Sequence, residues 1–381
     1  MFLSIGMVFT FLLVAYTIVR WGNVRLTGST PVGLFTFIAI LFASGLDVGL
    51  IMFPLTEFPV YADLVASPEY GFTNPLAIEF GFWGFLIWSF YFLTTFYFCL
   101  IEPKVKFFEI KIVKLINNFV IVTTCALTAH LFLINLPWYL PALGDGSTVG
   151  SIFYGIVFVS IVLATLSSTH IRYVRILSLA SVAMFAVLIT VMWVSSGLGI
   201  LGMVESLGLV GGYFTNLPKF ALPFNAYHEF YLFWWFSWSI MIGQFVSRFV
   251  GGLKTYQVLV SMLVIPSIPL AIWFSVLYKF HVDAISIVQF NIAMAVVGTV
   301  FVVNSLDSLI RLYTDNMGYT YGRLGAFKYI VGNVVALSCL GLLFTYGYLT
   351  PETVGSIVIA IFFVCFFYIL AKKRSKVASI K

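Results

Sequence analysis

Charged residues are scarce in this sequence. Of its 381 residues only 9% are charged, whereas 61% are hydrophobic and the mean hydropathy is +1.07. A water-soluble domain of this length could not bury so much apolar surface and would expose large hydrophobic patches. The composition therefore excludes a soluble protein and indicates an integral membrane protein.

Cysteine and histidine are also scarce, at four residues each. The cysteines lie in apolar runs without paired spacing, which excludes a disulfide framework. The histidines are scattered, without the i, i+4 spacing or the neighbouring CxxC motif that metal ligation needs. No cofactor is therefore expected, and no metal other than Na⁺. A membrane enzyme is the least supported interpretation, because no nucleophile and base are paired in the sequence.

Long apolar runs are abundant. A helix needs about 20 residues to cross about 30 Å of hydrocarbon. Eleven runs are long enough, near 2–20, 33–54, 78–101, 112–137, 148–168, 174–195, 229–250, 256–279, 285–313, 325–346 and 352–371. The first run lacks a basic n-region and a cleavage site, so we expect a retained span. These runs predict an all-α polytopic membrane protein with about 11 transmembrane helices.

The basic residues lie in short connections between the apolar runs, so the net charge of +6 does not indicate nucleic-acid binding. These connections alternate with others that are almost free of Lys and Arg. By the positive-inside rule the basic connections are cytoplasmic. We therefore expect the N-terminus outside and the C-terminus inside the cell.

One long connection, 197–228, mixes glycines with apolar residues and predicts an amphipathic helix on the membrane surface. It separates five spans in 32–196 from five in 229–372. An odd number of spans in each half gives the halves opposite orientations, as in inverted-repeat transporters. We therefore predict a five-plus-five inverted repeat, preceded by an extra helix and cytoplasmic loop (1–31) and followed by a short basic tail (373–381).

The second apolar run contains Ser44-Gly45-Leu46-Asp47-Val48-Gly49. Each glycine costs about 1 kcal/mol of helix propensity relative to alanine, so we expect the helix to open here, with Gly45 and Gly49 in the unwound part. The alternative is close packing of small residues. Asp47 favours a functional site, because a carboxylate near the bilayer centre costs about 2.5–3.5 kcal/mol unless it has a proton, a cation or a partner.

Asp307 is the second carboxylate that we expect within the membrane. Arg311 follows one helical turn later, so a structural ion pair and a transport role are both open. Asn304, Ser305 and Ser308 supply oxygens suited to Na⁺, although such residues also form ordinary interhelical hydrogen bonds. The same two interpretations apply to three threonines of the fourth run, Thr123, Thr124 and Thr128.

Aromatic residues are plentiful, at 18% of the chain. Two sets each share one side of an ideal helix, namely Trp83, Trp88 and Tyr91, and Trp234, Trp235 and Trp238. The first set spans about 140° of arc and the second about 100°. Two such walls facing one cavity would attract a quaternary ammonium group, by about 2 kcal/mol per dry contact. The alternative is simple packing, since aromatic residues are common in membrane helices.

Taken together, four stretches resemble the betaine/choline/carnitine transporter family, which shares the fold of the leucine transporter. They are Ser44–Gly49 with Thr56-Glu57, Trp83–Tyr91, Trp234–Gly243 with Phe245, Arg248 and Gly251, and Asn304–Ser308. The loop Trp21–Leu26 also looks like a family loop, and the resemblance covers nearly the whole chain. It implies a short member that lacks the family's first helix and its long C-terminal helix.

The resemblance also implies residue roles. The cage around a trimethylammonium group would consist of Trp83, Trp88, Tyr91 and Trp235, and the pathway beside it would be lined by Trp234 and Trp238. The family's second sodium site would match the carbonyls of Ala43, Leu46 and Phe301 and the side chains of Asn304 and Ser305. The sequence departs from sodium-coupled betaine carriers at Asp47, where they have glycine, and at Asn304, where they have threonine.

The resemblance implies import of a small quaternary ammonium or sulfonium compound, such as choline, glycine betaine or carnitine, by alternating access in a bacterial-type cytoplasmic membrane. Coupling to H⁺ or to Na⁺ stays open, because Asp47 could serve either ion. The alternative is a membrane sensor that binds the same ligands without transport, and a channel is disfavoured because a tight site conducts poorly. The family further implies a homotrimer, with 197–226 at the subunit contacts.

Overall fold

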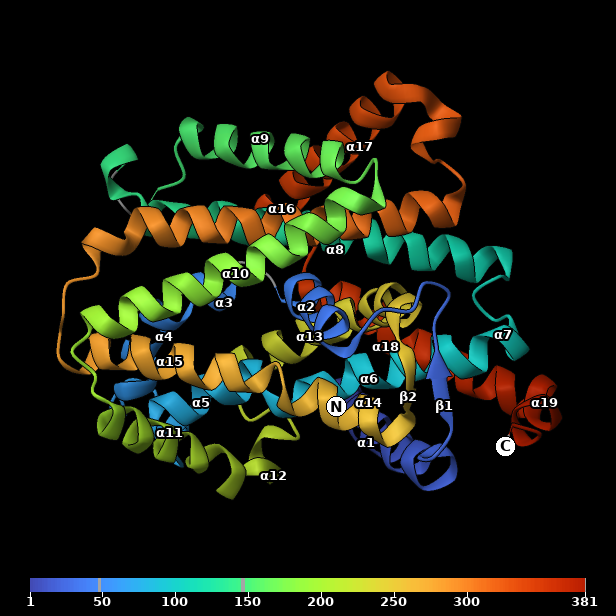
Figure 1. Ribbon diagram of the computed structural model, residues 1–381, viewed down its shortest axis with the longest axis horizontal. Helices are drawn as coiled ribbons and strands as arrows, with labels where there is room; N and C mark the ends of the chain where they lie inside the picture. The colour runs from blue at the N-terminus through green and yellow to red at the C-terminus, as the bar shows by residue number, and fades with distance from the viewer. Residues whose placement is uncertain (47–48, 145–147, 381) are drawn as a thin grey trace.

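The computed structural model describes residues 1–46, 49–144 and 148–380, and these are almost entirely helical (Figure 1). The first part of the chain forms α1 (Phe2–Trp21), α2 (Leu34–Gly45), α3 (Gly49–Met52), α4 (Pro54–Ala62), α5 (Pro75–Trp83), α6 (Trp88–Phe96), α7 (Glu102–Val105), α8 (Lys111–Tyr139), α9 (Ser151–Ser167) and α10 (Ile171–Ser195). The second part forms α11 (Ile200–Thr215), α12 (Leu217–Phe220), α13 (Ala226–Val246), α14 (Thr255–Val264), α15 (Ser267–Val282), α16 (Asn291–Met317), α17 (Tyr321–Thr345), α18 (Pro351–Tyr368) and α19 (Arg374–Ala378).

Eight helical segments of the described ranges are long and apolar enough to cross a membrane, and α2, α9 and α11 are shorter apolar helices. The protein is therefore an all-α, polytopic membrane protein, as the apolar runs predicted. The total of about eleven spans and the inverted repeat stay predictions.

The helices α2, α13 and α16 meet in the middle of the bundle. The helix α16 packs against α2, α8, α9 and α10, while α13 packs against α2, α6 and α18. Because α2 touches both α13 and α16, it lies between the helix that carries three of the tryptophans and the helix that carries Asn304. Residues far apart in the sequence are thus brought to one place.

A small antiparallel sheet, which the sequence did not predict, joins two of the basic connections. The strand β1 (Arg25–Thr27) pairs with β2 (Gly251–Lys254), side by side at the right of Figure 1. Arg25 donates a hydrogen bond of 2.8 Å to the carbonyl of Gly252. The loops after α1 and α13 satisfy each other's backbone groups in this way. The labels α7 and α19 lie at the same end of the molecule, so segments expected to be cytoplasmic gather there.

The expected opening of the second apolar run is present. The helix α2 ends at Gly45, Leu46 is extended (φ −117°, ψ 147°), and α3 begins at Gly49. Asp47 and Val48 lie outside the described residues. Gly45 and Gly49, which were expected in the unwound part, are thus the last residue of α2 and the first residue of α3.

A second break, between α5 and α6, was not predicted. Gly84 is extended and Phe85 has a φ of 45°, so Trp83 and Trp88 lie on different helices. The arc of 140° assumed one continuous helix and was therefore wrong. Other helices satisfy the freed backbone groups, because the N–H of Phe85 donates to Ser267 Oγ at 2.9 Å and the N–H of Leu86 donates to the Tyr213 hydroxyl at 3.2 Å.

The long connection after α10 contains α11 and α12, so a helix forms where an amphipathic one was expected. The helix α11 packs against α5 and α15. Its outward-facing residues include Ile200, Leu201 and Val204, which are exposed. This face is compatible with contact to lipid or to another subunit.

Candidate functional site

The two predicted aromatic sets meet in one cluster. The ring centroid of Trp83 lies 5.3 Å from that of Trp234 and 5.4 Å from that of Trp235, with interplanar angles of 84° and 83°. Tyr91 links the sets, at 6.2 Å from Trp235 and 5.6 Å from Trp88. All five side chains are buried. The break after Trp83 therefore places Trp83 on a different helix from Trp88 and Tyr91, but all three remain in one cluster.

Trp238, which was expected to line the pathway beside the cage, is the residue of the two aromatic sets that no ring contact among the described residues joins to this cluster. It is buried on α13, one helical turn after Trp234. Its position fits the pathway beside the cluster that the resemblance implied, and its role there stays a prediction.

Hydrogen bonds fix two of the rings. The Trp235 indole donates to the carbonyl of Phe82 at 2.8 Å, and the Tyr91 hydroxyl donates to the carbonyl of Gly45 at 2.9 Å. The second bond ties the aromatic cluster to the open end of α2. A β-carbon added at Gly45 would lie 3.1 Å from the Tyr91 ring and 3.6 Å from Trp88, so only glycine fits there without crowding.

Four buried indole N–H groups of the predicted cage and pathway have no hydrogen-bond partner within the described ranges. They belong to Trp83, Trp88, Trp234 and Trp238. An unsatisfied buried donor costs about 1–3 kcal/mol, and buried polar groups are normally paired. Unused donors beside aromatic faces are suited to a ligand that has both an apolar cation and an oxygen acceptor.

The predicted ion-coupling residues also come together, at the contact of α2 with α16. Asn304 donates from Nδ2 to the carbonyl of Ala43 at 2.7 Å, and Ser305 donates to the carbonyl of Leu46 at 3.1 Å. Phe301 is fully buried one turn before Ser305. The Ser178 hydroxyl donates to Asn304 Oδ1 at 2.9 Å, which leaves the amide nitrogen facing Ala43. Asn304 thus presents a donor at this carbonyl, where the sequence had suggested an oxygen ligand.

Of the two other residues predicted at the broken helix, Gly49 begins α3 and is buried. Asp47 lies outside the described residues. Its proposed part in coupling stays a prediction from the sequence.

Asp307 is fully buried and accepts hydrogen bonds from Ser167 of α9 and, at 3.2 Å, from Ser308. The Arg311 guanidinium instead lies 3.9 Å from Asp315 and donates to the carbonyl of Ser168 at 3.2 Å. The suggested Asp307–Arg311 ion pair is therefore not formed. The cause is that α9 approaches close enough to supply a hydroxyl and a carbonyl.

The three threonines of the fourth apolar run bond within their own helix. Each donates to a backbone carbonyl three or four residues earlier on α8. These bonds are structural, as one of the two interpretations had it, but they run within one helix where interhelical bonds were expected.

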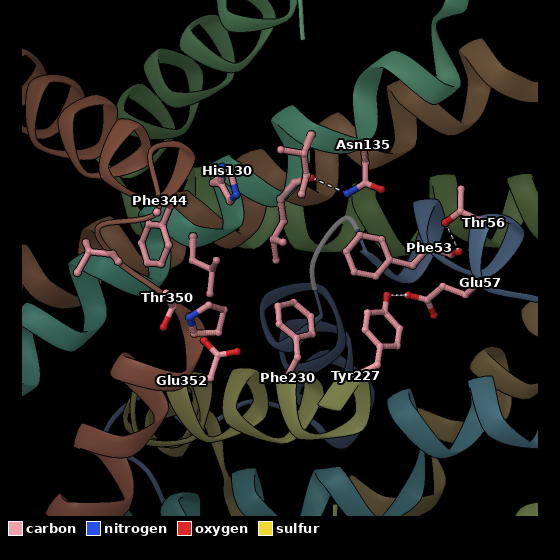
Figure 2. A pocket seen from close by; sticks show the side chains of 16 residues that line it. Phe53, Thr56, Glu57, His130, Asn135, Tyr227, Phe230, Phe344, Thr350 and Glu352 are labelled. Atoms are coloured by element: carbon pink, nitrogen blue, oxygen red, sulfur yellow. Dashed lines mark hydrogen bonds between the residues drawn. The ribbon is translucent and has the colours of Figure 1, made fainter. Parts of the chain in front are cut away.

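A cavity of about 440 Å³ lies beside the aromatic cluster. Figure 2 shows the side chains that line it. Phe53, Glu57, Tyr227 and Phe230 are among its lining residues. The Phe53 ring lies 6.0 Å from Trp83 and 5.8 Å from Trp234, so it forms a layer between the cavity and the cluster. Sequence reasoning missed Phe53, because its importance comes only from where α3 and α4 place it.

Sequence reasoning also missed Glu79, which is fully buried on α5. The signal was present, since this glutamate stands between Ile78 and Phe80 at the start of the third apolar run. A carboxylate inside an apolar run marks a functional candidate in a membrane protein.

Comparisons with known proteins point to transport. The chain is 24% identical over 330 residues to glycine betaine transporter 1 of Vibrio parahaemolyticus, covering 75% of this chain and 62% of that protein. It is 24% identical over 302 residues to the glycine betaine transporter OpuD of Bacillus subtilis, covering 68% and 58%. This chain is similar to glycine betaine transporters. A protein of Haemophilus influenzae named as an uncharacterized transporter is 26% identical over 71% of this chain and 46% of its own length.

The chain thus spans about three fifths of the length of the two betaine transporters that it matches. No protein-family model matches it.

Proposed function

We propose that the protein is a secondary active transporter of the betaine/choline/carnitine type, which imports a small quaternary ammonium compound by alternating access. The observation that carries this proposal is the convergence of Trp83, Trp234, Trp235 and Tyr91 from separate helices into one buried cluster. The names of the similar proteins support glycine betaine as the first substrate to test. Choline and carnitine share its trimethylammonium group and come next.

The cluster offers two kinds of contact. Three or four dry cation–π contacts of about 2 kcal/mol each would supply a gross 6–8 kcal/mol, which approaches micromolar affinity before ordering costs. The unused indole donors would bind an oxygen of the substrate. A substrate with a methylated cation and a carboxylate or hydroxyl therefore fits better than a bare tetraalkylammonium ion.

Access from the cavity to the cluster would require Phe53 to move. Phe53 precedes α4, and the neighbouring α2 end is held by Tyr91 through Gly45. A shift of the α2–α4 segment would therefore change both the layer over Trp83 and Trp234 and the hydrogen bond of Tyr91. This coupling of a broken helix to the binding cluster is the mechanical basis that we propose for alternating access.

The contact between α2 and α16 favours H⁺ over Na⁺ as the coupling ion. In the second sodium site that the resemblance implies, the carbonyl of Ala43 would bind the cation. Here the Asn304 amide donates to this carbonyl, so its partial positive charge holds α2 to α16 in place of a bound ion. The bacterial-type cytoplasmic membrane, the external N-terminus and a trimer with α11 at its contacts belong to this proposal as well.

Counterflow in proteoliposomes tests transport against the alternative of a sensor. Vesicles loaded with unlabelled glycine betaine should take up labelled glycine betaine, whereas a sensor would bind the ligand without exchange. Quenching of tryptophan fluorescence, measured on the same preparation, reports binding. Binding without exchange would favour the sensor, and the absence of both for betaine, choline and carnitine would contradict the whole proposal.

A further inference from the structure

Glu79 is the least satisfied charged side chain beside the aromatic cluster. It is fully buried on α5, and neither of its carboxylate oxygens has a hydrogen-bond partner among the described residues. Its neighbours include the carboxylate of Glu57, the hydroxyl of Tyr61 and the indole of Trp83. An ionised carboxylate without donors is costly in an apolar interior, so this position calls for a positive ligand.

Glu57, on α4, differs from Glu79 in that its carboxylate oxygens have hydrogen-bond donors. It accepts hydrogen bonds from the hydroxyl groups of Tyr61 at 2.6 Å and Tyr231 at 2.8 Å, and from Tyr227 (Figure 2). Three donors stabilise the ionised form of a carboxylate. Glu57 also lines the cavity, whereas Glu79 lies deeper. A carboxylate that has three hydroxyl donors and lines the cavity thus lies next to a buried one that lacks donors among the described residues.

The groups around Glu57 and Glu79 supply no positive charge to Glu79. In the described ranges, no salt bridge includes either carboxylate. Besides Trp83, the groups that interact with these two carboxylates are tyrosines, namely Tyr61, Tyr70, Tyr139, Tyr227 and Tyr231.

The remaining titratable groups of the helices packed on α5 have other contacts. His228 of α13 stacks on Phe82 at 5.0 Å. On α15, the Lys279 ammonium lies 2.5 Å from Asp283, and Tyr278 and His281 pack against Phe58. On α11, the Tyr213 hydroxyl accepts from the N–H of Leu86, and Glu205 is exposed.

We propose that Glu79 and Glu57 form a proton-binding pair, and that the proton which this pair takes up is the coupling ion of the transport proposed above, on which this inference rests. Two adjacent carboxylates in an apolar site hold one proton more readily than two charges. The hydroxyl hydrogens of three tyrosines already point at Glu57, so a proton on Glu79 fits this site better than a metal ion, which needs several free oxygen ligands.

The pair is linked to the aromatic cluster through Trp83. Glu79 precedes Trp83 by one turn of α5, and the Trp83 indole is among its neighbours. When Glu79 is ionised, it can accept from the Trp83 N–H. When Glu79 is protonated, its own hydroxyl can donate to Glu57, and the Trp83 N–H becomes available to an oxygen of the substrate. The proton enters from the cavity through Glu57 and is released on the opposite side of the membrane after the conformational change.

The test measures how proteoliposomes take up labelled glycine betaine under two driving forces, with the membrane potential clamped. One is a pH gradient, and the other is the counterflow of unlabelled glycine betaine. A gradient of one pH unit, acidic on the cavity side, should drive about a tenfold accumulation for one proton per cycle. In Glu79→Gln, the pH-driven accumulation divided by the counterflow uptake of the same vesicles should fall about tenfold, because glutamine cannot bind and release a proton. Glu205→Gln, the same change at an exposed carboxylate of α11, should keep the wild-type ratio.

A second measurement needs no variant and guards against a Glu79→Gln protein that fails to fold. Addition of glycine betaine to weakly buffered wild-type protein should take up protons, which a pH-indicator dye detects. Binding without proton uptake at every pH between 5 and 8, the range in which perturbed carboxyl groups titrate at functional sites, would overturn the inference.

Failure of the inference is distinguishable from failure of the proposed function. Wild-type protein that exchanges glycine betaine but accumulates it only with a Na⁺ gradient would overturn the proton pair and leave transport intact. A His228→Asn variant that loses pH-driven accumulation while Glu79→Gln keeps it would also overturn the pair. Wild-type protein that neither binds nor exchanges any onium compound would instead contradict the proposed function.

Discussion

The aromatic cluster and the contact between α2 and α16 lie next to each other but differ in how completely their polar groups are paired. At the contact, Asn304 both donates to Ala43 and accepts from Ser178, and Ser305 donates to Leu46. In the cluster, the indole N–H groups of Trp83 and Trp234 have no partner in the described part of the chain.

This difference separates two functions of buried polar groups. A fully paired network holds two helices in one arrangement, because breaking it exposes several unsatisfied groups at once. Unpaired groups in a cluster lower the stability of the protein, and a ligand that supplies hydrogen-bond acceptors can offset this loss when it binds. We therefore expect substitutions at the contact to change stability most, and substitutions in the cluster to change binding most.

The largest expected effect on stability comes from Asn304→Ala. It removes the 2.7 Å hydrogen bond to the buried carbonyl of Ala43, which keeps only a 3.5 Å bond from Ser305, and it removes the acceptor of Ser178. These losses should lower the free energy of unfolding by about 2–4 kcal/mol. Thermal unfolding in detergent measures the loss. Asn135→Ala is the control, because Asn135 donates only to the carbonyl of Leu131 on its own helix among its described contacts, and it should change stability by less than about 1 kcal/mol. Equal effects of the two substitutions would remove the distinction between contact and cluster.

Trp235→Leu should weaken binding of glycine betaine by about 30-fold, because it removes one dry cation–π contact of about 2 kcal/mol. Titration of the remaining tryptophan fluorescence gives the dissociation constant. Trp138→Leu changes a half-exposed tryptophan of α8 away from the cluster and should leave binding unchanged. If both variants bind like the wild type, the cluster is packing and has no part in recognition.

Gly45→Ala should have a smaller effect that falls on both regions. The new methyl group would lie 3.1 Å from the Tyr91 ring, and the resulting crowding should cost about 1 kcal/mol in stability. It should also disturb the hydrogen bond from Tyr91 to the carbonyl of Gly45, and so slow counterflow. A normal exchange rate in this variant would show that the tie between α2 and the cluster does not matter for transport.

The smallest expected effect concerns Asp47, whose coupling role is predicted from the sequence alone. If the pair of Glu57 and Glu79 carries the coupling proton, uptake by Asp47→Gly should keep its dependence on pH. Uptake rates at several pH values, measured beside Glu79→Gln, decide between the two carboxylates. Loss of pH dependence in Asp47→Gly alone would assign the proton to Asp47.

Sequence reasoning reached the candidate site by two different routes. Hydropathy and the glycines at 45 and 49 predicted the membrane helices and the opening after Gly45, because both depend on local composition. Five of the six predicted aromatic residues meet, all but Trp238, although the helix on which Trp83 and Trp88 were placed is broken at Gly84. The residues still meet because Trp88 and Tyr91 stay together on α6, and because Tyr91 and Trp83, on opposite sides of the break, both contact Trp235.

The errors share a physical origin. Arg311 pairs with Asp315 and not with Asp307, because Ser167 of another helix approaches Asp307. Asn304 presents a donor to Ala43, because Ser178 takes up its oxygen. In each case the sequence supplied the correct polar residue but not its partner, which belongs to a helix more than a hundred residues away.

The sequence by itself determined that this is a helical membrane protein with a broken helix and with tryptophans and carboxylates inside its apolar runs. Those properties follow from composition and from short-range backbone preferences, which any stretch of chain carries with it. Only the tertiary structure decided which rings touch, which carboxylate is satisfied by hydroxyl groups and which is left without a donor. Hydrogen bonds and ring contacts act over a few ångströms, so they depend on how distant helices pack and not on the order of residues within one of them.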